Sequence, residues 1–340
     1  MKKRFSLLFC ISFCFMLASV NVFAQKTDAE IKQEVLTKYS TRDYVFTPLP
    51  ERGYNYFKVA QNTYFVHNDF DNMVFFVTKT GVVVVDPKPA LSQTVIKVIK
   101  EVTNKPITHV IYSHHHRDHS QGAHFFPESA TLIAHKKAAE FMAIANDPKR
   151  PAPDVTWTDK YTLKTGGFTL ELKDLGRNWH SQQDVVMYAP EQKILIAIDM
   201  FHPDAAPWIH FGESADPMFA FGLPDLLLKS YEFDFVVVGH EKIIGTRAHM
   251  EKYKALIADM TKILLDVVQS PTYKHLSEQT EKRFSEFEVH YKYKAGIESA
   301  INLCAAKLID SEWSQKLRNI ELNAAENFQT MFMHIIVLDP

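Results

Sequence analysis

Ser113-His114-His115-His116-Arg117-Asp118-His119 places four potential metal ligands close together, directly after the apolar segment 109–112. That segment, His-Val-Ile-Tyr, predicts a buried β-strand. The loop at the carboxyl end of such a strand is where α/β folds place their chemistry. Alternate residues of an extended chain point the same way, so we expect His114 and His116 to reach one metal ion. Asp118 and His119, where the chain turns, should reach a second ion, and His115 should point away.

Three further candidates follow predicted strands in the same manner. His180 lies in the loop after a hairpin, Asp199 ends the apolar run 194–198, and His240 follows the run 235–238 through Gly239. Scattered structural histidines have no reason to gather at strand ends, so we interpret these residues as ligands. Neutral imidazole and carboxylate suit Zn²⁺ and comparable divalent ions. Two such ions would supply a metal-activated hydroxide and polarise the bond that it attacks.

Strand and helix patterns alternate along residues 56–249. The predicted strands cover residues 64–66, 73–77, 81–86, 109–112, 132–134, 161–163, 168–172, 184–188, 193–198 and 235–238. The predicted helices cover residues 92–102, with Ser92 as the N-cap, and residues 136–146. This interleaving indicates the α/β class. After His249 the strand patterns stop, and residues 250–340 predict a C-terminal helical region.

Residues 113–119 resemble the H-x-H-x-D-H motif of the metallo-β-lactamase superfamily. His180, Asp199 and Gly239-His240 match the later ligand motifs of that family in order. Asp86 matches an early aspartate that supports the metal loop without binding metal. The resemblance covers about residues 59–241. It implies an αββα sandwich with the site at one edge of the two sheets.

The resemblance also implies how the ligands divide. One zinc ion takes His114, His116 and His180, a second takes Asp118, His119 and His240, and Asp199 bridges the two. We also give Asp118 a catalytic role. The bridging aspartate resembles the glyoxalase II-like, lactonase and phosphodiesterase branches, and no cysteine lies near it to match the cysteine-ligand β-lactamases. His119 is followed by Ser120-Gln121-Gly122 and not by the common x-G-G, so the resemblance does not fix the turn beyond the ligands.

These features lead to one main functional hypothesis and two alternatives. The main hypothesis is a zinc-dependent hydrolase of a small-molecule ester, thioester, lactone or amide. A β-lactamase is favoured by export and disfavoured by Asp199. An iron-dependent redox protein of the same fold is disfavoured by the complete ligand set. The formal net charge of −2, without a long basic run, gives no support for a nucleic-acid partner, and the sequence does not decide the oligomeric state.

An apolar stretch directly after Asp199 has two interpretations of equal weight. It contains Phe201, Pro203, Pro207, Trp208, Phe211, Pro217, Met218, Phe219 and Phe221. These side chains could form a wall or lid beside the metals and select a lipophilic substrate. Alternatively, they could pack against the C-terminal helices or a second copy of the chain.

The first 24 residues have the order of a secretory signal peptide. A basic start is followed by the mostly apolar residues 5–20, and Val22-Phe23-Ala24 offers the small residues that a signal peptidase reads. The apolar run is short for a bilayer span of about 20 residues, so we expect no stable membrane anchor after cleavage. Cys10 and Cys14 would leave with it, and Cys304 alone cannot form an internal disulfide. We therefore expect a periplasmic or secreted protein with an N-terminal segment 25–55 and a catalytic domain 56–249.

We predict that the mature protein begins near Gln25. The reason is the basic, apolar and small-residue order of residues 1–24. N-terminal sequencing of protein recovered from outside the cytoplasm tests it. Recovery of Met1 on the exported protein would contradict the prediction.

Overall fold

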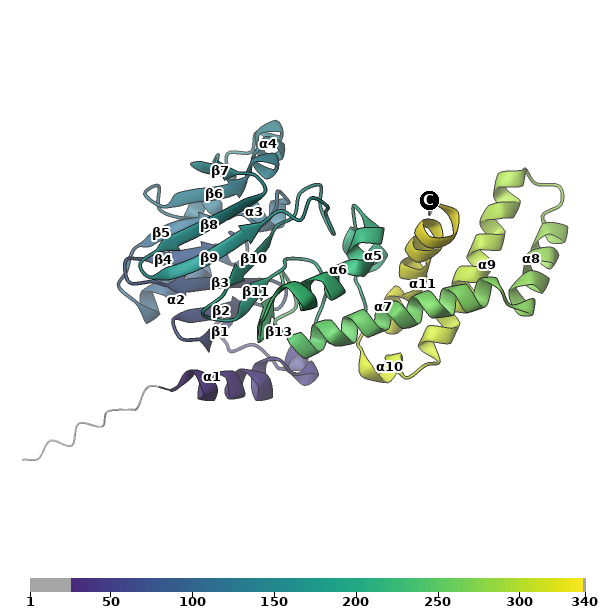
Figure 1. The fold of residues 1–340 in the computed structure, drawn as a ribbon, viewed down its shortest axis with the longest axis horizontal. Coiled ribbons are helices and arrows are strands. Elements are labelled where there is room, and N and C mark those ends of the chain that lie inside the picture. Colours follow the sequence, from purple (N-terminus) through teal and green to yellow (C-terminus); the bar gives the residue numbers. More distant parts are fainter. Residues whose placement is uncertain (1–25, 339–340) are drawn as a thin grey trace, which may run out of the picture.

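A computed structural model describes residues 26–338 of the chain. The predicted signal peptide, with Cys10 and Cys14, lies outside the described residues and stays a prediction. Within residues 26–338, no helix combines the length and the apolar character needed to cross a membrane. Figure 1 shows a sheet-rich body on one side and a group of helices on the other, joined by one long helix.

The sheet-rich body contains two β-sheets, whose strand orders are β1-β2-β3-β4-β5-β6-β7 and β13-β12-β11-β10-β9-β8. The first sheet comprises β1 (Asn55–Ala60), β2 (Thr63–His67), β3 (Asn72–Val77), β4 (Val82–Val85), β5 (Ile107–Ile111), β6 (Thr131–His135) and β7 (Val155–Trp157). The second comprises β8 (Lys160–Thr165), β9 (Phe168–Lys173), β10 (Val186–Ala189), β11 (Ile194–Ile196), β12 (Phe235–Val237) and β13 (Gly245–Thr246). Both sheets mix parallel and antiparallel pairs, in agreement with the predicted α/β class.

Three of these strands and one helix cap differ from the sequence prediction. β1, β7 and β13 were not predicted. The last two span only three and two residues, too short to show a period. Helix α2 (Ser92–Val102) has the predicted bounds, but Ser92 is its first residue and not its N-cap. The Ser92 hydroxyl instead donates to the carbonyl of Lys88 at 2.7 Å.

Successive side chains along a strand point to opposite faces of the sheet and so pack into different cores. On β4, Val83 and Val85 face the core between the two sheets, whereas Val82 and Val84 face a separate core under α2. On β12, Val237 faces the core between the sheets and Val236 faces the opposite side. Because both sheets are covered on both faces, the arrangement is the expected αββα sandwich.

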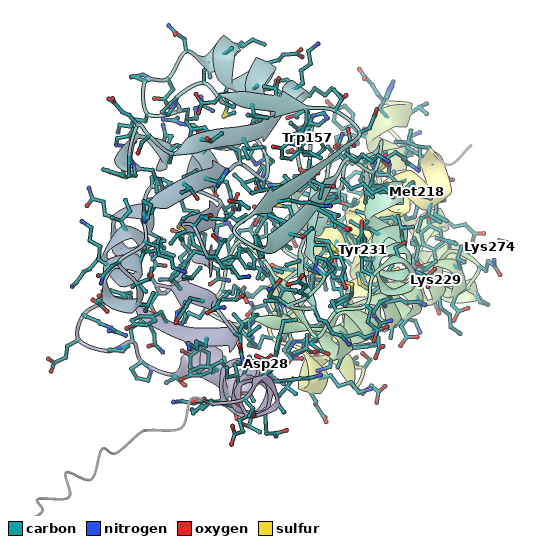
Figure 2. All side chains as sticks on the ribbon, turned by 60° about the vertical axis from the view of Figure 1, so that its left-hand side comes forward. Asp28, Trp157, Met218, Lys229, Tyr231 and Lys274 are labelled. Carbon is teal, nitrogen blue, oxygen red and sulfur yellow. The ribbon has the colours of Figure 1, made fainter. Side chains whose placement is uncertain are left out.

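The outer face of the second sheet and the C-terminal helices share one hydrophobic core. Val236 belongs to the same buried cluster as Met260, Cys304 and Phe328. The helices on this side are α5 (Ile209–Glu213), α6 (Pro217–Ser230), α7 (Arg247–Val268), α8 (Pro271–Arg283), α9 (Val289–Ile309), α10 (Trp313–Lys316) and α11 (Ile320–Met331). In Figure 2, Met218 and Lys274 lie on this helical side, and Asp28 of α1 (Asp28–Glu34) lies at the foot of the sheets. This core contains residues on both sides of the expected domain boundary after residue 249. The division into domains stays a prediction.

We predict that Phe235→Ala lowers the free energy of unfolding by roughly 3–5 kcal/mol, the usual loss when a buried aromatic side chain is removed. Phe235 is 2% exposed between the two sheets. Phe46→Ala is the matched control, because Phe46 is 69% exposed and its removal should change stability little. Denaturant titration of both variants tests this, and equal losses would show that the core between the sheets does not carry the stability.

Candidate metal centre

All seven residues predicted as ligands meet at one edge of the sandwich. His114 and His116 lie in the loop after β5, and Asp118 and His119 lie in the short helix α3 (Arg117–Ser120) that follows. His180 lies between β9 and β10, Asp199 follows β11, and His240 follows β12. The side chains form two groups whose potential ligand atoms lie within 4.8 Å of one another, His114/His116/His180 and Asp118/His119/Asp199/His240. These groups have the composition implied by the resemblance.

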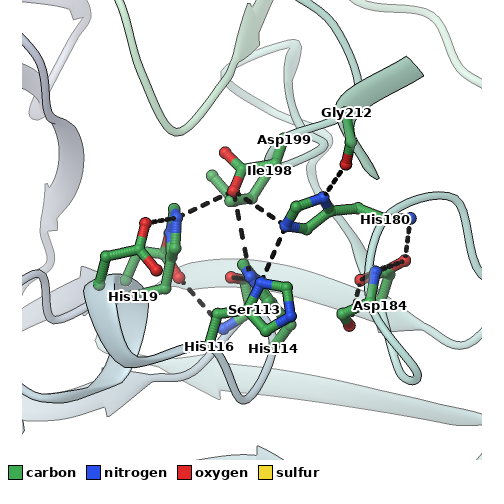
Figure 3. Close-up of polar contacts among 12 residues, drawn as sticks. Ser113, His114, His116, His119, His180, Asp184, Ile198, Asp199 and Gly212 are labelled. Carbon is green, nitrogen blue, oxygen red and sulfur yellow. Dashed lines mark hydrogen bonds and ion pairs between the residues drawn. The ribbon is translucent and has the colours of Figure 1, made fainter. Parts of the chain in front are cut away.

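The first group presents three imidazole nitrogens to one point (Figure 3). His180 Nε2 lies 2.9 Å from His116 Nδ1. The other nitrogen of His180, Nδ1, lies 2.6 Å from the carbonyl oxygen of Gly212. A carbonyl can only accept a hydrogen bond, so Nδ1 carries a proton, and Nε2 is the nitrogen that holds the lone pair in the neutral ring. His114 Nδ1 is engaged by the hydroxyl of Ser113 at 2.9 Å, which leaves Nε2 of His114 to face the group.

The second group is centred on His119, which is fully buried. His119 Nε2 lies 2.9 Å from Asp118 Oδ2 and 3.3 Å from His240 Nε2. Its Nδ1 donates to Asp86 Oδ2 at 2.6 Å. Asp86 Oδ1 also accepts from the backbone N–H of Ser113 at 3.3 Å. Asp86 therefore supports the loop and orients a ligand from behind, which is the role that the resemblance implies for it.

Asp199 lies between the two groups. Its Oδ2 is 2.9 Å from His119 Nε2 and 3.4 Å from His180 Nε2, and its Oδ1 is 3.6 Å from His240 Nε2. Gly239 makes room for it, because a Cβ at that position would lie 2.1 Å from Asp199 Oδ1 and 2.7 Å from the His119 ring. A side chain at residue 239 would displace the carboxylate from this position.

The charges at the site are those of a cation-binding centre. Burial lowers the pKa of His114 well below its usual range, and His119 lowers it further, so the ring is neutral. Burial raises the pKa of Asp199, but the hydrogen bond with His119 and the attraction of His119, His240 and His180 together hold that pKa well below its usual range. Burial lowers the pKa of His119, yet Asp199 and Asp86 raise it well above its usual range. Without a metal ion, protonated His119 balances part of the negative charge of these carboxylates, and it would have to release that proton to bind a metal ion.

Polar atoms without partners indicate where a cation would bind. Among the described residues, neither His114 Nε2 nor Asp199 Oδ1 has a hydrogen-bond partner, although both atoms are buried. Buried polar atoms are normally paired, so each unpaired one needs an explanation. Nitrogen and oxygen donors of this kind coordinate Zn²⁺ and comparable divalent ions. The residues present therefore fit a metal ion in each group.

Several supporting residues could not be recognised in the sequence. Asp184 Oδ2 accepts the backbone N–H groups of Trp179 and His180 at 2.8 Å each, which fixes the loop that carries His180. Lys88 is fully buried, and its Nζ lies 3.2 Å from Asp71 Oδ1 and 3.1 Å from His119 Nε2. Asp184 follows His180 closely in sequence, but no local pattern marks Asp71 or Lys88 as parts of the site.

Histidines near the motif that were not chosen as ligands lie elsewhere. The ring of His115 stacks on Phe141, with centroids 4.5 Å apart, so it points away as predicted. His135 Nδ1 accepts from the backbone N–H of Lys137 and caps helix α4 (Lys136–Ala145).

The two acids of the centre differ in exposure. The side chain of Asp118 is 53% exposed, whereas that of Asp199 is 9% exposed. Solvent therefore reaches the centre on the side of Asp118.

The apolar stretch after Asp199 divides between the two interpretations. Phe201 and Phe211 are each 3% exposed and belong to the core shared with the C-terminal helices. Phe201 contacts Tyr253 of α7, with ring centroids 5.4 Å apart. Trp208, in contrast, is 51% exposed. For Phe201 and Phe211, packing against the helices is therefore the correct interpretation.

Comparison with known proteins agrees with this geometry. Residues 68–240 match the model of the family described as the metallo-beta-lactamase superfamily. The 2,4-dinitroanisole O-demethylase subunit alpha of Nocardioides sp. (strain JS1661) is 29% identical over 126 residues. That similarity covers 35% of this chain and 38% of the subunit, so the chain matches well under half of that relative's length.

Two solved structures show how far the fold extends. A metallo-beta-lactamase from Pontibacter korlensis has a TM-score of 0.52 and 20% identity, and the match covers 60% of this chain and 99% of that one. A double mutant of the sec-alkyl sulfatase PisA1 has a TM-score of 0.59 and 16% identity, and covers 84% of this chain and 52% of the sulfatase. The match to the sulfatase covers 84% of this chain, which is more of the chain than residues 1–249 contain. The fold shared with the sulfatase therefore includes C-terminal helices.

We predict that the purified protein binds close to two divalent ions, and that Asp118→Asn or His240→Ala empties one site selectively. Both residues belong to the second group, so the first group keeps its three histidines. His115→Ala is the control, since that ring points away from the centre. Metal analysis after saturation and gel filtration measures the stoichiometry. One ion in the wild type, unchanged in both variants, would rule out two separate sites.

Proposed function

This chain belongs to the metallo-β-lactamase superfamily, and we propose that it is a zinc-dependent hydrolase of an ester, thioester, lactone or amide. The observation that carries the proposal is the position of Asp199, whose two oxygens face both groups of ligands. A carboxylate in this position supports two ions held side by side. Bound divalent ions of this kind lower the pKa of water and polarise the carbonyl group of a substrate.

The protein's own residues would divide the work as follows. His114, His116 and His180 would hold the first ion, and Asp118, His119 and His240 would hold the second, with Asp199 between the two groups. Asp86 and Gly212 fix the rings of His119 and His180 from behind. We assign the catalytic role to Asp118, because its exposed carboxylate can contact an incoming substrate. The part of this carboxyl group that faces the protein is desolvated, which raises its pKa, but hydrogen bonds with His119 and His240 lower the pKa well below the usual range, so Asp118 is charged at neutral pH.

Two alternatives remain within the family. A β-lactamase is compatible with the fold of the Pontibacter protein, but that likeness, at 20% identity, concerns the fold alone. Iron-dependent redox chemistry is the other alternative, and it has to be considered because the similar O-demethylase subunit is not named as a hydrolase. The metal of this chain therefore has to be identified directly. Metal analysis of protein purified without added metal distinguishes zinc from iron.

We further propose that the protein works outside the cytoplasm on a small molecule. The signal-peptide pattern of residues 1–24 supports export. The formal net charge of −2 gives no support for a nucleic-acid ligand.

We predict that an ester, thioester or lactone is turned over faster than any β-lactam. If Asp199 bridges the two ions, it would take up room between them and leave less space for a rigid fused-ring lactam. The test is a panel of nitrocefin, a penicillin, a carbapenem, a short p-nitrophenyl ester, an acyl-homoserine lactone and bis-p-nitrophenyl phosphate. A secondary alkyl sulfate and 2,4-dinitroanisole extend it to the chemistry in the names of the similar proteins.

Asp199→Ser should lower the activity found in this panel by on the order of 10–100-fold, the usual effect of disturbing the groups that organise a metal site. A chelator should abolish the activity, and added Zn²⁺ should restore it. The His115→Ala variant serves again as the control. Turnover of a penicillin or carbapenem above that of every ester and lactone would reverse the order of the two hypotheses.

A further inference from the structure

Helix α5 is a turn of left-handed helix. His210, Phe211, Gly212 and Glu213 all have positive φ, at 51°, 55°, 76° and 52°. The turn is closed by backbone hydrogen bonds from Gly212 N to Trp208 O at 3.2 Å and from Ser214 N to His210 O at 3.1 Å. L-residues disfavour this conformation because Cβ approaches the following carbonyl oxygen, and three of the four residues are not glycine. Contacts from outside the turn must therefore hold it in place.

This turn presents one carbonyl to the metal centre. The oxygen of Gly212 accepts the hydrogen bond from His180 Nδ1 at 2.6 Å (Figure 3). That bond sets both the tautomer and the orientation of the His180 ring, and so directs Nε2 toward His116. A Cβ at Gly212 would lie 3.3 Å from the carbonyl oxygen of Asp199. The turn thus lies close against the residues of the centre.

The turn is held by α11, far along the chain. The side chain of Asn327 is 1% exposed and uses both ends of its amide. Its Oδ1 accepts from the backbone N–H of Phe211 at 2.8 Å, and its Nδ2 donates to the carbonyl of Pro207 at 2.9 Å. One turn later, the hydroxyl of Thr330 lies 3.0 Å from Nδ1 of His210. These contacts fix the start and the middle of the left-handed turn.

We propose that Asn327 is a positioning residue for the first metal site, acting through the left-handed turn on His180. Asn327 forms its side-chain hydrogen bonds with Phe211 and Pro207 and with none of the seven ligands. It holds Phe211, the adjacent Gly212 then presents its carbonyl, and the carbonyl orients the ring. The inference rests on the proposed role of His180 as a ligand. It assigns the C-terminal helical region a part in the metal centre.

Asn323 provides a matched control on the same helix. It lies one turn before Asn327, is 6% exposed, and donates through Nδ2 to the same carbonyl of Pro207 at 3.0 Å. The bond from Phe211 N goes to Asn327. Asn327→Ala and Asn323→Ala therefore each remove a buried amide from α11, but Asn327→Ala alone frees the left-handed turn. A general loss of packing would affect both variants alike.

The first measurement is Zn²⁺ affinity by competition with a chromophoric chelator, in an Asp118→Asn background that leaves the first site to be filled. Asn327→Ala should weaken this affinity by roughly 10-fold or more, the usual effect of losing a group that orients a ligand. Asn323→Ala should change it by less than about 3-fold. Thr330→Val, which keeps the shape of the side chain, should weaken it in the same direction and provides the test if Asn327→Ala does not fold.

The second measurement needs no metal. In full-length metal-free protein with labelled histidine, a protected Nδ1–H resonance of His180 should be visible by NMR, and His180→Gln assigns it. Asn327→Ala should abolish the protection and Asn323→Ala should keep it. Equal behaviour of the two variants in both measurements overturns the inference. If the wild type binds no Zn²⁺ while the resonance behaves as expected, the proposed function fails and the positioning of His180 stands.

Discussion

The Asp199 carboxylate is buried among imidazole rings that come from both sheets, and its negative charge has to be balanced there. A buried charge is tolerated only when it is paired, hydrogen-bonded or bound to a metal ion. The surrounding fold is arranged to meet this requirement. Gly239 gives the carboxylate room, Asp86 secures the ring of His119, and Gly212 secures that of His180. The positions of the remaining ligands follow from the same constraint.

The local part of the site could be predicted because it depends on short-range rules. His114, His116, Asp118 and His119 follow a buried strand directly, and His180, Asp199 and His240 lie beyond the ends of other strands. The supporting residues could not be predicted, because their roles arise from contacts between distant segments. Lys88 meets His119 from the loop before α2, and Asn327 meets Phe211 across the helical side. Neither residue differs in its sequence surroundings from an ordinary lysine or asparagine.

The contrast between short-range patterns and contacts between distant segments also explains which strands could be predicted. Strands β3 and β4 are mostly apolar and buried along nearly their whole length, β5 ends in the buried pair Val110-Ile111, and all three were predicted from their composition. β7 and β13 are short edge strands that form only because a neighbour pairs with them. The left-handed conformation of residues 210–213 is likewise imposed from outside, since no sequence pattern there favours it over a right-handed helix.

The division of the ligands between the sheets has a consequence for folding. The first sheet supplies His114, His116, Asp118 and His119, and the second supplies His180, Asp199 and His240, so neither group is complete within one sheet. An ion bound to either group would act as a crosslink that joins the open edges of the sandwich. Binding to the folded state alone adds stability by mass action, about 2.7 kcal/mol when free metal is 100 times its dissociation constant. Metal supply would then set part of the stability of the sandwich, as well as what the site can do.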